Sequence, residues 1–163
     1  MGVAGTGKTT VGQQLALALG WPFFDGDDFH PQANKDKMAA GQPLTDDDRW
    51  PWLAALRGLI EQKLKEEETA VVACSALKAS YRTYLLPDDP RLALVHLTGP
   101  RTLIQERLQA RPGHFFDASL LSDQLAVLDP PSASEALTVD CQLASTEIVT
   151  TIYRYLSLQS ICE

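Results

Sequence analysis

Apolar positions along the chain alternate between helical periodicity and short uninterrupted runs. Between residues 8 and 19, apolar side chains recur at i, i+4, i+7 and i+8 and the pattern stops at Gly20, which predicts an amphipathic helix. Thr45, followed by acidic residues, is a candidate N-cap ahead of another helical pattern. Helical spacing further predicts helices over 31–41, 52–64, 100–111 and 119–128, one that follows Lys78 and ends at Leu86, and a last one around 148–156.

The uninterrupted apolar runs predict strands that are buried on both sides. They lie at 21–24, 70–74, 92–97 and 136–139, each followed by a helical pattern or a turn. Strands that alternate with helices and lack polar alternation are typical of a parallel sheet covered by helices on both faces. We therefore predict an α/β fold in one domain, residues 1–163.

The first eight residues after Met1 form a complete G-x-x-x-x-G-K-[ST] motif. In such a loop, backbone N–H groups surround the phosphates of a nucleotide, Lys8 reaches the β- and γ-phosphate oxygens, and the Thr9 hydroxyl binds Mg²⁺. The helix that starts at Lys8 adds the positive end of its dipole. The predicted ATP-binding residues of this segment are Gly2, Val3, Ala4, Gly5, Thr6, Gly7, Lys8, Thr9 and Thr10.

The loop stands unusually close to the start of the sequence. A loop of this kind normally connects a buried strand to a helix, and only Met1 precedes it here. We therefore expect the printed sequence to begin at an internal methionine, with the first strand of the sheet in an apolar segment upstream.

Composition limits the kinds of partner that the protein can bind. The net charge of −7 argues against a general nucleic-acid binder, because binding to the phosphate backbone needs a basic face. No apolar run approaches the length of a membrane span. The three cysteines are far apart and in no metal-binding spacing, so we expect free thiols and a cytoplasmic protein.

Two carboxylates follow the first predicted strand, in Asp25-Gly26-Asp27. Ligands of open parallel sheets bind beyond the carboxyl ends of the strands, which places this turn beside the glycine-rich loop. One carboxylate there can hold Mg²⁺ through its water shell, and a second can deprotonate an attacking hydroxyl. The alternative is that both are turn residues beside a glycine.

A resemblance to a known family extends these observations. In order and spacing, a set of motifs between Gly2 and about Asp140 resembles the gluconokinase family of small ATP-dependent kinases, which have a nucleoside-monophosphate-kinase-like fold with three layers and a mobile lid. The matching segments are Gly2–Thr9, Asp25-Gly26-Asp27, His30-Pro31, Asn34, Lys37-Met38, Gly41, Pro43-Leu44, Asp46, Asp48-Arg49, Pro51-Trp52-Leu53, Cys74-Ser75-Ala76-Leu77-Lys78, Tyr81-Arg82 and His114-Phe115.

The resemblance implies a role for each element of the phosphate site. Lys8 would neutralise charge on the transferred phosphoryl group, and Thr9 with Asp25 would position Mg²⁺. Asp27 would receive the proton of the acceptor hydroxyl. Arg107 and Arg111, four residues apart, resemble lid arginines that close over the phosphates, within a lid at about 107–118. Exposed helix charge is the alternative for both arginines.

The same resemblance implies a substrate region at about 28–64 that binds gluconate. A carboxylate substrate needs a fixed cation, for which Arg49, Lys78 and Arg82 are the candidates. His30, Lys37 and His114 are further candidates for substrate contacts. For His30 the alternative is a helix cap or surface residue, and for Lys37 a solvated side chain.

Together these expectations describe an enzyme that transfers the γ-phosphate of ATP to the 6-hydroxyl of D-gluconate. Another small-molecule kinase, of the shikimate or polyol type, is the main alternative. A non-catalytic nucleotide-binding regulator is the other, and the joint presence of Asp25, Asp27 and Arg49 speaks against it. Related enzymes are commonly dimers, so a homodimer is expected from the resemblance alone.

Overall fold

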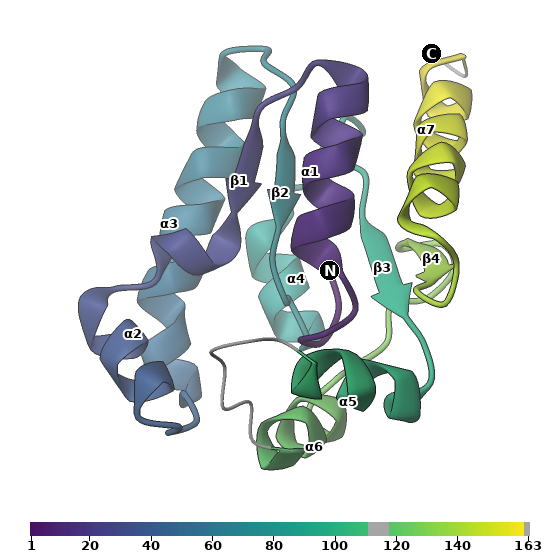
Figure 1. The fold of residues 1–163 in the computed structure, drawn as a ribbon. Coiled ribbons are helices and arrows are strands. Elements are labelled where there is room, and N and C mark those ends of the chain that lie inside the picture. Colours follow the sequence, from purple (N-terminus) through teal and green to yellow (C-terminus); the bar gives the residue numbers. More distant parts are fainter. Residues whose placement is uncertain (111–117, 162–163) are drawn as a thin grey trace.

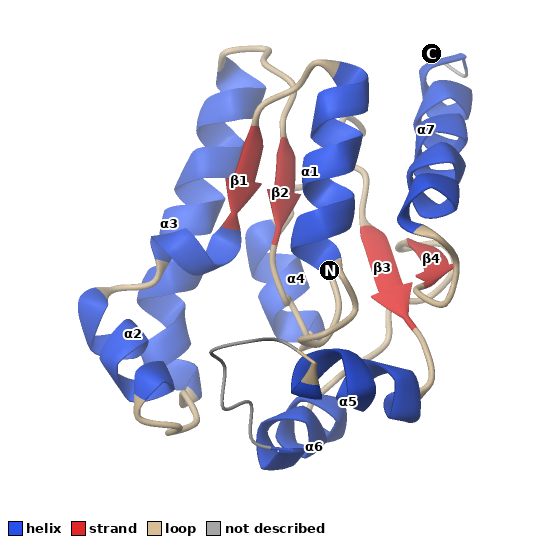
Figure 2. Cartoon of the chain, viewed as in Figure 1, coloured by secondary structure: helices blue, strands red, loops and turns tan. Residues whose placement is uncertain are grey.

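Two pairs of parallel strands lie between two layers of helices in the computed structural model, which describes residues 1–110 and 118–161. Helices α1 and α7 lie on the near face of the strands in Figure 1, with α3 and α4 behind them. Figure 2 shows how small the strand content is beside the helices. The elements are α1 (Lys8–Leu19), β1 (Phe23–Asp25), the 3₁₀ helix η1 (Gly26–Phe29), α2 (Gln32–Ala39), α3 (Asp46–Lys65), β2 (Val71–Ala73), α4 (Ala79–Leu85), β3 (Val95–Thr98), α5 (Arg101–Gln109), α6 (Ala118–Ala126), β4 (Leu137–Asp140) and α7 (Ser145–Ile161).

The helices agree with the apolar spacing of the sequence. α1 has the predicted bounds, and its C-cap Gly20 adopts the left-handed conformation at φ 69°. Thr45 caps α3 in a reciprocal capping box with Asp48, as its position predicted. α3 begins at Asp46 and continues through Pro51, so the helix is longer than the 52–64 pattern indicated. Pro51 removes one N–H donor near the start of a 20-residue helix without ending it.

The parallel pairing of the strands is confirmed. β1 pairs with β2, Phe23 lying opposite Val71, and β3 pairs with β4, Val95 lying opposite Leu137. Within the described residues, the strands form two sheets of two strands each.

Met1 and Gly2 lie between the two pairs. The Met1 amine donates to the Val95 carbonyl at 2.5 Å, and the Leu97 N–H donates to the Met1 carbonyl at 2.9 Å. On the other side, the Gly2 N–H donates to the Ser75 carbonyl at 3.2 Å. Met1 is thus the point at which the main chain links β2 with β3, and the glycine-rich loop follows directly.

Apolar side chains on both sides of the strands hold the site in place. One cluster joins α3 to α4 around Trp52, Leu53 and Leu56, all at most 1% exposed. Another joins α1 to α7 and to β3, with Leu15 and Ile152 among its members. These clusters fix the start of α1 and the start of α3 relative to each other, which is where the candidate site forms.

Candidate active site

The glycine-rich loop takes a conformation that its glycines permit. Gly2, Gly5 and Gly7 have φ values of 141°, 84° and 91°, in a region that other residues rarely adopt. A Cβ on Gly5 would lie 2.8 Å from the side chain of Leu108, so the loop packs directly against α5. The loop can therefore approach a phosphate chain only with glycine at these positions.

The loop directs backbone N–H groups and one lysine toward the start of α1. Gly7 is the N-cap and provides no side-chain cap for the first turn of the helix, which is the usual arrangement for a phosphate. Lys8 donates from Nζ to the Val3 carbonyl at 3.0 Å, and the side chain thus curls back over the loop. The loop also makes a contact that the sequence analysis did not predict. The Ala4 N–H donates to Oε1 of Gln124 on α6 at 2.7 Å.

Thr9 and Asp25 meet as the sequence predicted they would. The Thr9 hydroxyl donates to Oδ2 of Asp25 at 2.9 Å, joining the first turn of α1 to the end of β1. A hydroxyl and a carboxylate at this distance are hard oxygen ligands of the kind Mg²⁺ takes, with phosphates and waters completing its shell. Among the described residues no group of three His, Cys, Asp or Glu side chains is arranged to hold a metal ion by itself.

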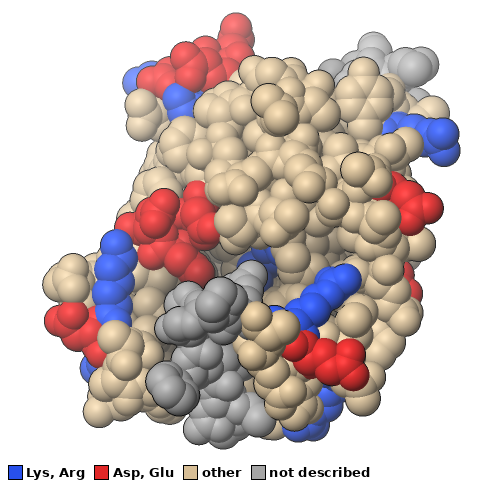
Figure 3. Space-filling model, in the orientation of Figure 1, with Lys and Arg blue, Asp and Glu red and all other residues tan. Residues whose placement is uncertain are grey.

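Asp27 follows Asp25 by two residues, in the first turn of the short helix η1. Its N–H donates to Oδ1 of Asp25 at 3.1 Å, and burial, helped by the charges of Asp25 and Asp28, raises the pKa of the Asp27 carboxyl. A carboxylate whose pKa is raised toward neutrality is a better proton acceptor than an ordinary surface aspartate. Figure 3 shows acidic side chains gathered where β1 runs into η1.

Trp52 holds this turn against the substrate region. Its indole Nε1 donates to the Gly26 carbonyl at 2.7 Å. Gly26 itself must lack a side chain, because a Cβ would lie 2.7 Å from the Ala73 carbonyl of β2. Trp52 belongs to the matching segment Pro51-Trp52-Leu53, but the helical spacing of the apolar residues predicted only a role in packing for this side chain.

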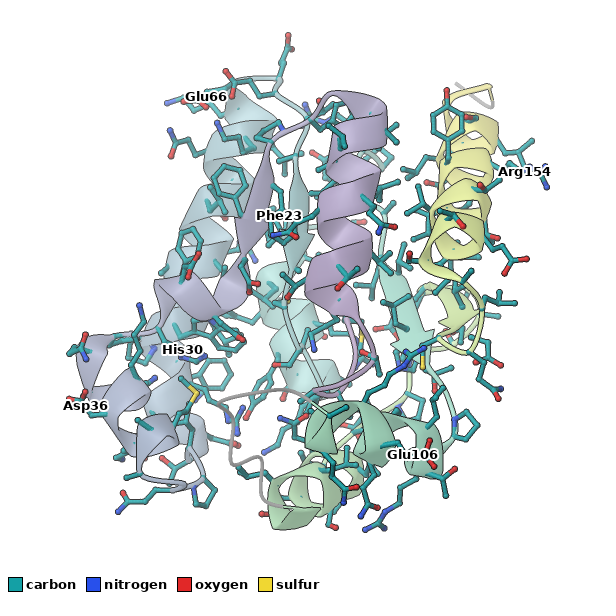
Figure 4. The ribbon with its side chains drawn as sticks, viewed as in Figure 1. Phe23, His30, Asp36, Glu66, Glu106 and Arg154 are labelled. Carbon is teal, nitrogen blue, oxygen red and sulfur yellow. The ribbon has the colours of Figure 1, made fainter. Side chains whose placement is uncertain are left out.

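His30 stands at the junction of η1 and α2, where Figure 4 labels it. It is 8% exposed and stacks on the Trp52 ring at 4.4 Å between centroids, and its Nδ1 lies 3.3 Å from the Asn34 amide. Burial, with the positive charges of Arg49 and Lys35, lowers the pKa of His30 to about 4. The alternative of a surface residue is therefore wrong, and a neutral imidazole faces the interior near Arg49.

Lys37 of α2 and Arg49 of α3 have different partners near the first turn of α3. Lys37 forms an ion pair with Asp48 at 2.7 Å and is 41% exposed, so part of its charge is already compensated. Arg49 donates to the Leu44 carbonyl at 3.2 Å and is partly buried. Its charge contributes, after burial, to the lowered pKa of His30.

Lys78 and Tyr81 converge on one carboxylate of α3, a cluster that the sequence did not predict. Lys78 Nζ lies 2.7 Å from both oxygens of Asp46, and the Tyr81 hydroxyl donates to Oδ1 of Asp46 at 2.5 Å. The acidic first turn of α3 was interpreted only as a helix start, and no short-range signal pairs residue 46 with residue 78. Asp46 thus links the substrate region to the loop that follows β2.

Arg82 has a different environment from the other two candidate cations. It is 3% exposed, lies 2.6 Å from Glu135 through Nε, and donates through Nη1 to the carbonyls of Leu77 and Asp129. Four bonds to a carboxylate and carbonyls, counting the longer one to Ala76 at 3.4 Å, fix the guanidinium within the protein. This geometry gives Arg82 a structural role, in contrast to the substrate contact that we predicted.

The lid falls largely outside the described residues. Arg111 and His114, which the sequence predicted as lid and substrate residues, lie in 111–117 and are not described. Arg107 is described: it projects from α5 and donates to the Cys141 carbonyl at 2.9 Å. α5 is also the helix against which Gly5 packs, so Arg107 belongs to an element that contacts the phosphate loop.

This geometry defines a class. A phosphate-binding loop, a hydroxyl and carboxylate pair for Mg²⁺, and a second carboxylate at the ends of parallel strands are the parts of a P-loop kinase for a small acceptor. A profile of the shikimate kinase family matches residues 4–152. Within that class, the chain belongs to the gluconokinase family.

The relatives on which this membership rests are similar over most of the chain. A gluconokinase of Gluconobacter oxydans is 51% identical over 135 residues, covering 83% of this chain and 76% of that protein. The thermoresistant gluconokinase of Escherichia coli is 43% identical over 142 residues, covering 86% of this chain and 81% of that protein. The crystal structure of a gluconokinase from Sinorhizobium meliloti superposes with a TM-score of 0.84 at 45% identity, covering 96% of this chain and 89% of that one. Shikimate kinase from Aquifex aeolicus, at 19% identity and a TM-score of 0.61, shares the fold.

Proposed function

We propose that the protein is an ATP-dependent gluconokinase, which transfers the γ-phosphoryl group of ATP to the 6-hydroxyl of D-gluconate and releases 6-phosphogluconate and ADP. The observation that carries this proposal is the arrangement around Asp25-Gly26-Asp27. The Asp25 carboxylate accepts a hydrogen bond from Thr9 of the phosphate loop, and the Asp27 carboxyl has a raised pKa. Family membership supports the choice of a sugar acid as acceptor.

In the proposed reaction the acceptor hydroxyl lies between Asp27 and the γ-phosphorus. The hydroxyl oxygen forms a bond to phosphorus, the bond from phosphorus to the bridging oxygen of ADP breaks, and Asp27 takes the hydroxyl proton. Mg²⁺, held through Thr9 and Asp25, would supply positive charge to the phosphates when bound. Lys8 and the N-terminus of α1 would stabilise the charge that accumulates on the transferred group.

The acceptor pocket would lie between η1 and the first turn of α3. Arg49, with a guanidinium fork, is the preferred partner for the substrate carboxylate, and Lys78 is a second cation bonded to Asp46. Neutral His30 has a ring nitrogen for a sugar hydroxyl, and Lys37 would contact the outer part of the substrate. Arg82 is left out of this pocket because of its buried pairing.

Arg107 and Arg111 stay in the proposal as groups that would close over the phosphates, and His114 as a substrate contact of the same segment. A homodimer and a cytoplasmic location likewise stay proposals. Cys74 and Cys141 are free thiols, which suits a reducing compartment. No helix of the described part of the chain is long and apolar enough to span a membrane.

Release of ADP with a panel of acceptors tests the proposal. D-gluconate, shikimate, a polyol and nucleoside monophosphates are compared at equal concentration in a coupled assay, and we expect turnover with gluconate to exceed the others at least about tenfold. Asp27→Asn should lower kcat about 10²- to 10⁴-fold with ATP affinity largely kept. Asp28→Asn is the matched control, because Asp28 is the neighbouring carboxylate of the same short helix and has no role in the proposed reaction. Equal loss in both variants, or a preference for shikimate, would contradict the assignment.

A further inference from the structure

Gln124 is a polar residue on the apolar face of α6. Leu121, three residues before it, is 1% exposed, and Leu128, four residues after it, packs against the same cluster, which also contains Val3 of the glycine-rich loop. Figure 1 shows α6 beside α5, below the start of α1. Because the leucines already hold α6 against the loop, packing alone does not explain a half-buried glutamine at this position.

The partner of Gln124 is a main-chain group of the glycine-rich loop. The Ala4 N–H donates to Oε1 at 2.7 Å, at the short end of the usual range for such bonds, and the two residues are 120 positions apart in the chain. Because an N–H group can only donate, the atom that faces it is the side-chain oxygen rather than the amide nitrogen. A neutral oxygen suits this place, since a carboxylate beside the loop would repel the phosphates of a nucleotide.

The peptide group that Gln124 binds also contacts Lys8. The N–H of Ala4 and the carbonyl of Val3 belong to one planar trans peptide group, so they point in opposite directions. The Val3 carbonyl accepts from the Thr6 hydroxyl at 2.9 Å and from Nζ of Lys8 at 3.0 Å. A rotation of the group would move both ends together. Gln124 therefore influences the position from which the Lys8 side chain reaches the phosphates.

The backbone on both sides of this peptide group restrains it weakly. Val3 and Ala4 lie between Gly2 and Gly5, which have φ values of 141° and 84°. A glycine has no Cβ to limit rotation about its own backbone bonds. The bond to Gln124 therefore adds a restraint that the loop sequence does not provide, and it adds it at the N–H end, opposite to the end that contacts Lys8.

We propose that Gln124 is a positioning residue for phosphoryl transfer: its side-chain oxygen orients the Val3–Ala4 peptide group and thereby places Nζ of Lys8 at the phosphates. The proposal rests on the phosphoryl transfer proposed above but not on the identity of the acceptor. In this scheme Gln124 acts through Lys8 rather than on the reacting atoms. Its effect on the rate therefore depends on the Lys8 ammonium group, which would stabilise the charge of the transferred group.

Gln124→Met tests the proposal, because methionine keeps the length of the side chain and removes the acceptor oxygen. We expect kcat to fall about 10- to 100-fold, since misplacing a catalytic group by about 1 Å can cost about 100-fold, whereas KM for gluconate should stay within about twofold. Gln124→Asn keeps the amide but is one methylene shorter, so it should lose a similar factor. Gln109→Met, at an exposed position of α5, is the matched control and should leave kcat unchanged.

A double-mutant cycle with Lys8→Met distinguishes a positioning role from a purely structural one. If Gln124 acts through Lys8, adding Gln124→Met to the Lys8→Met protein should change kcat by less than about twofold. A structural role would instead lower kcat by the same factor in both backgrounds. Equal factors would therefore overturn the proposal. A kcat within about twofold of the unsubstituted protein in both Gln124→Met and Gln124→Asn would overturn it as well.

Two further measurements keep this result separate from failures of folding and of the proposed function. Each variant is melted, and we expect Tm to stay within about 3 °C of the unsubstituted protein. A larger loss in both Gln124 variants would mean that the residue is structural, and would overturn the proposal. If the unsubstituted protein releases no ADP with gluconate, the proposed function fails, and the same cycle is measured with the acceptor of the panel that is turned over. Turnover of gluconate with equal factors in the cycle rejects only the role of Gln124.

Discussion

Replacing Trp52 by phenylalanine should damage both stability and turnover, because one indole supports two parts of the site. The indole N–H is the donor to the buried Gly26 carbonyl at 2.7 Å, and the same ring stacks on His30. A buried carbonyl left without its donor costs about 1–3 kcal/mol, and the smaller ring leaves a void at a position that is 1% exposed. We expect the free energy of unfolding to fall by about 2–4 kcal/mol.

The effect on turnover follows from the place of Gly26 between the two carboxylates. If the Gly26 carbonyl shifts, Asp27 moves relative to the phosphate loop, and misplacement of about 1 Å can cost about 10²-fold in rate. Urea unfolding and steady-state kinetics are measured on the same preparations, with Trp50→Phe as the control, because Trp50 is 39% exposed. A loss below about 0.5 kcal/mol, or equal effects in the control, would refute the reasoning about the indole hydrogen bond.

Four further predictions address charge and pH. Because the raised pKa of Asp27 belongs to the proposed base, kcat should fall as pH falls through that pKa, and a profile that stays flat down to pH 4 would contradict this. Since burial disfavours its charged form, Asp27→Asn should also raise Tm at pH 7.5, and a lower Tm there would argue against the stated cause. His30 has a folded-state pKa of about 4, so its contribution to stability is complete above pH 6.5 and is lost as pH falls toward 4. His30→Gln should flatten that part of the plot of Tm against pH, and thermal melts at each pH would show this. Arg49→Ala should raise KM for gluconate with the fold intact. Arg82→Ala should instead lower the free energy of unfolding by about 1–3 kcal/mol, because carbonyls of the loop after β2 and of residue 129 lose their donor; the opposite split in kinetics and urea unfolding would reverse the two roles.

Local patterns predicted those parts of the fold that depend on neighbouring residues. α1 and its glycine cap follow from apolar spacing, and the Thr45 cap from the acidic residues after it. The pairing of Thr9 with Asp25 could also be predicted, because parallel strands bring their carboxyl ends to one edge. The strands were placed correctly to within a few residues, and their exact ends depend on which neighbours they pair with.

Roles decided by distant contacts could not be predicted. Lys78 and Arg82 are four residues apart, yet Lys78 lies at the N-cap of α4 and bonds to Asp46, whereas Arg82 turns inward. The difference is set by Glu135, 53 residues further along the chain, which has no local signature. Gln124 reaches the phosphate loop from a larger separation of 120 residues.

The pairing of Arg82 with Glu135 also constrains how this protein can change over time. A guanidinium that is 3% exposed cannot be left alone, so losing Glu135 first leaves an uncompensated buried charge, and losing Arg82 first leaves the carbonyls of Ala76, Leu77 and Asp129 without this donor. Neutral drift at either position therefore passes through an unstable intermediate unless both residues change together. The two positions form a coupled pair in evolution. A designed library should therefore vary them jointly, and apolar pairs of similar volume are the replacements that this buried site can accept.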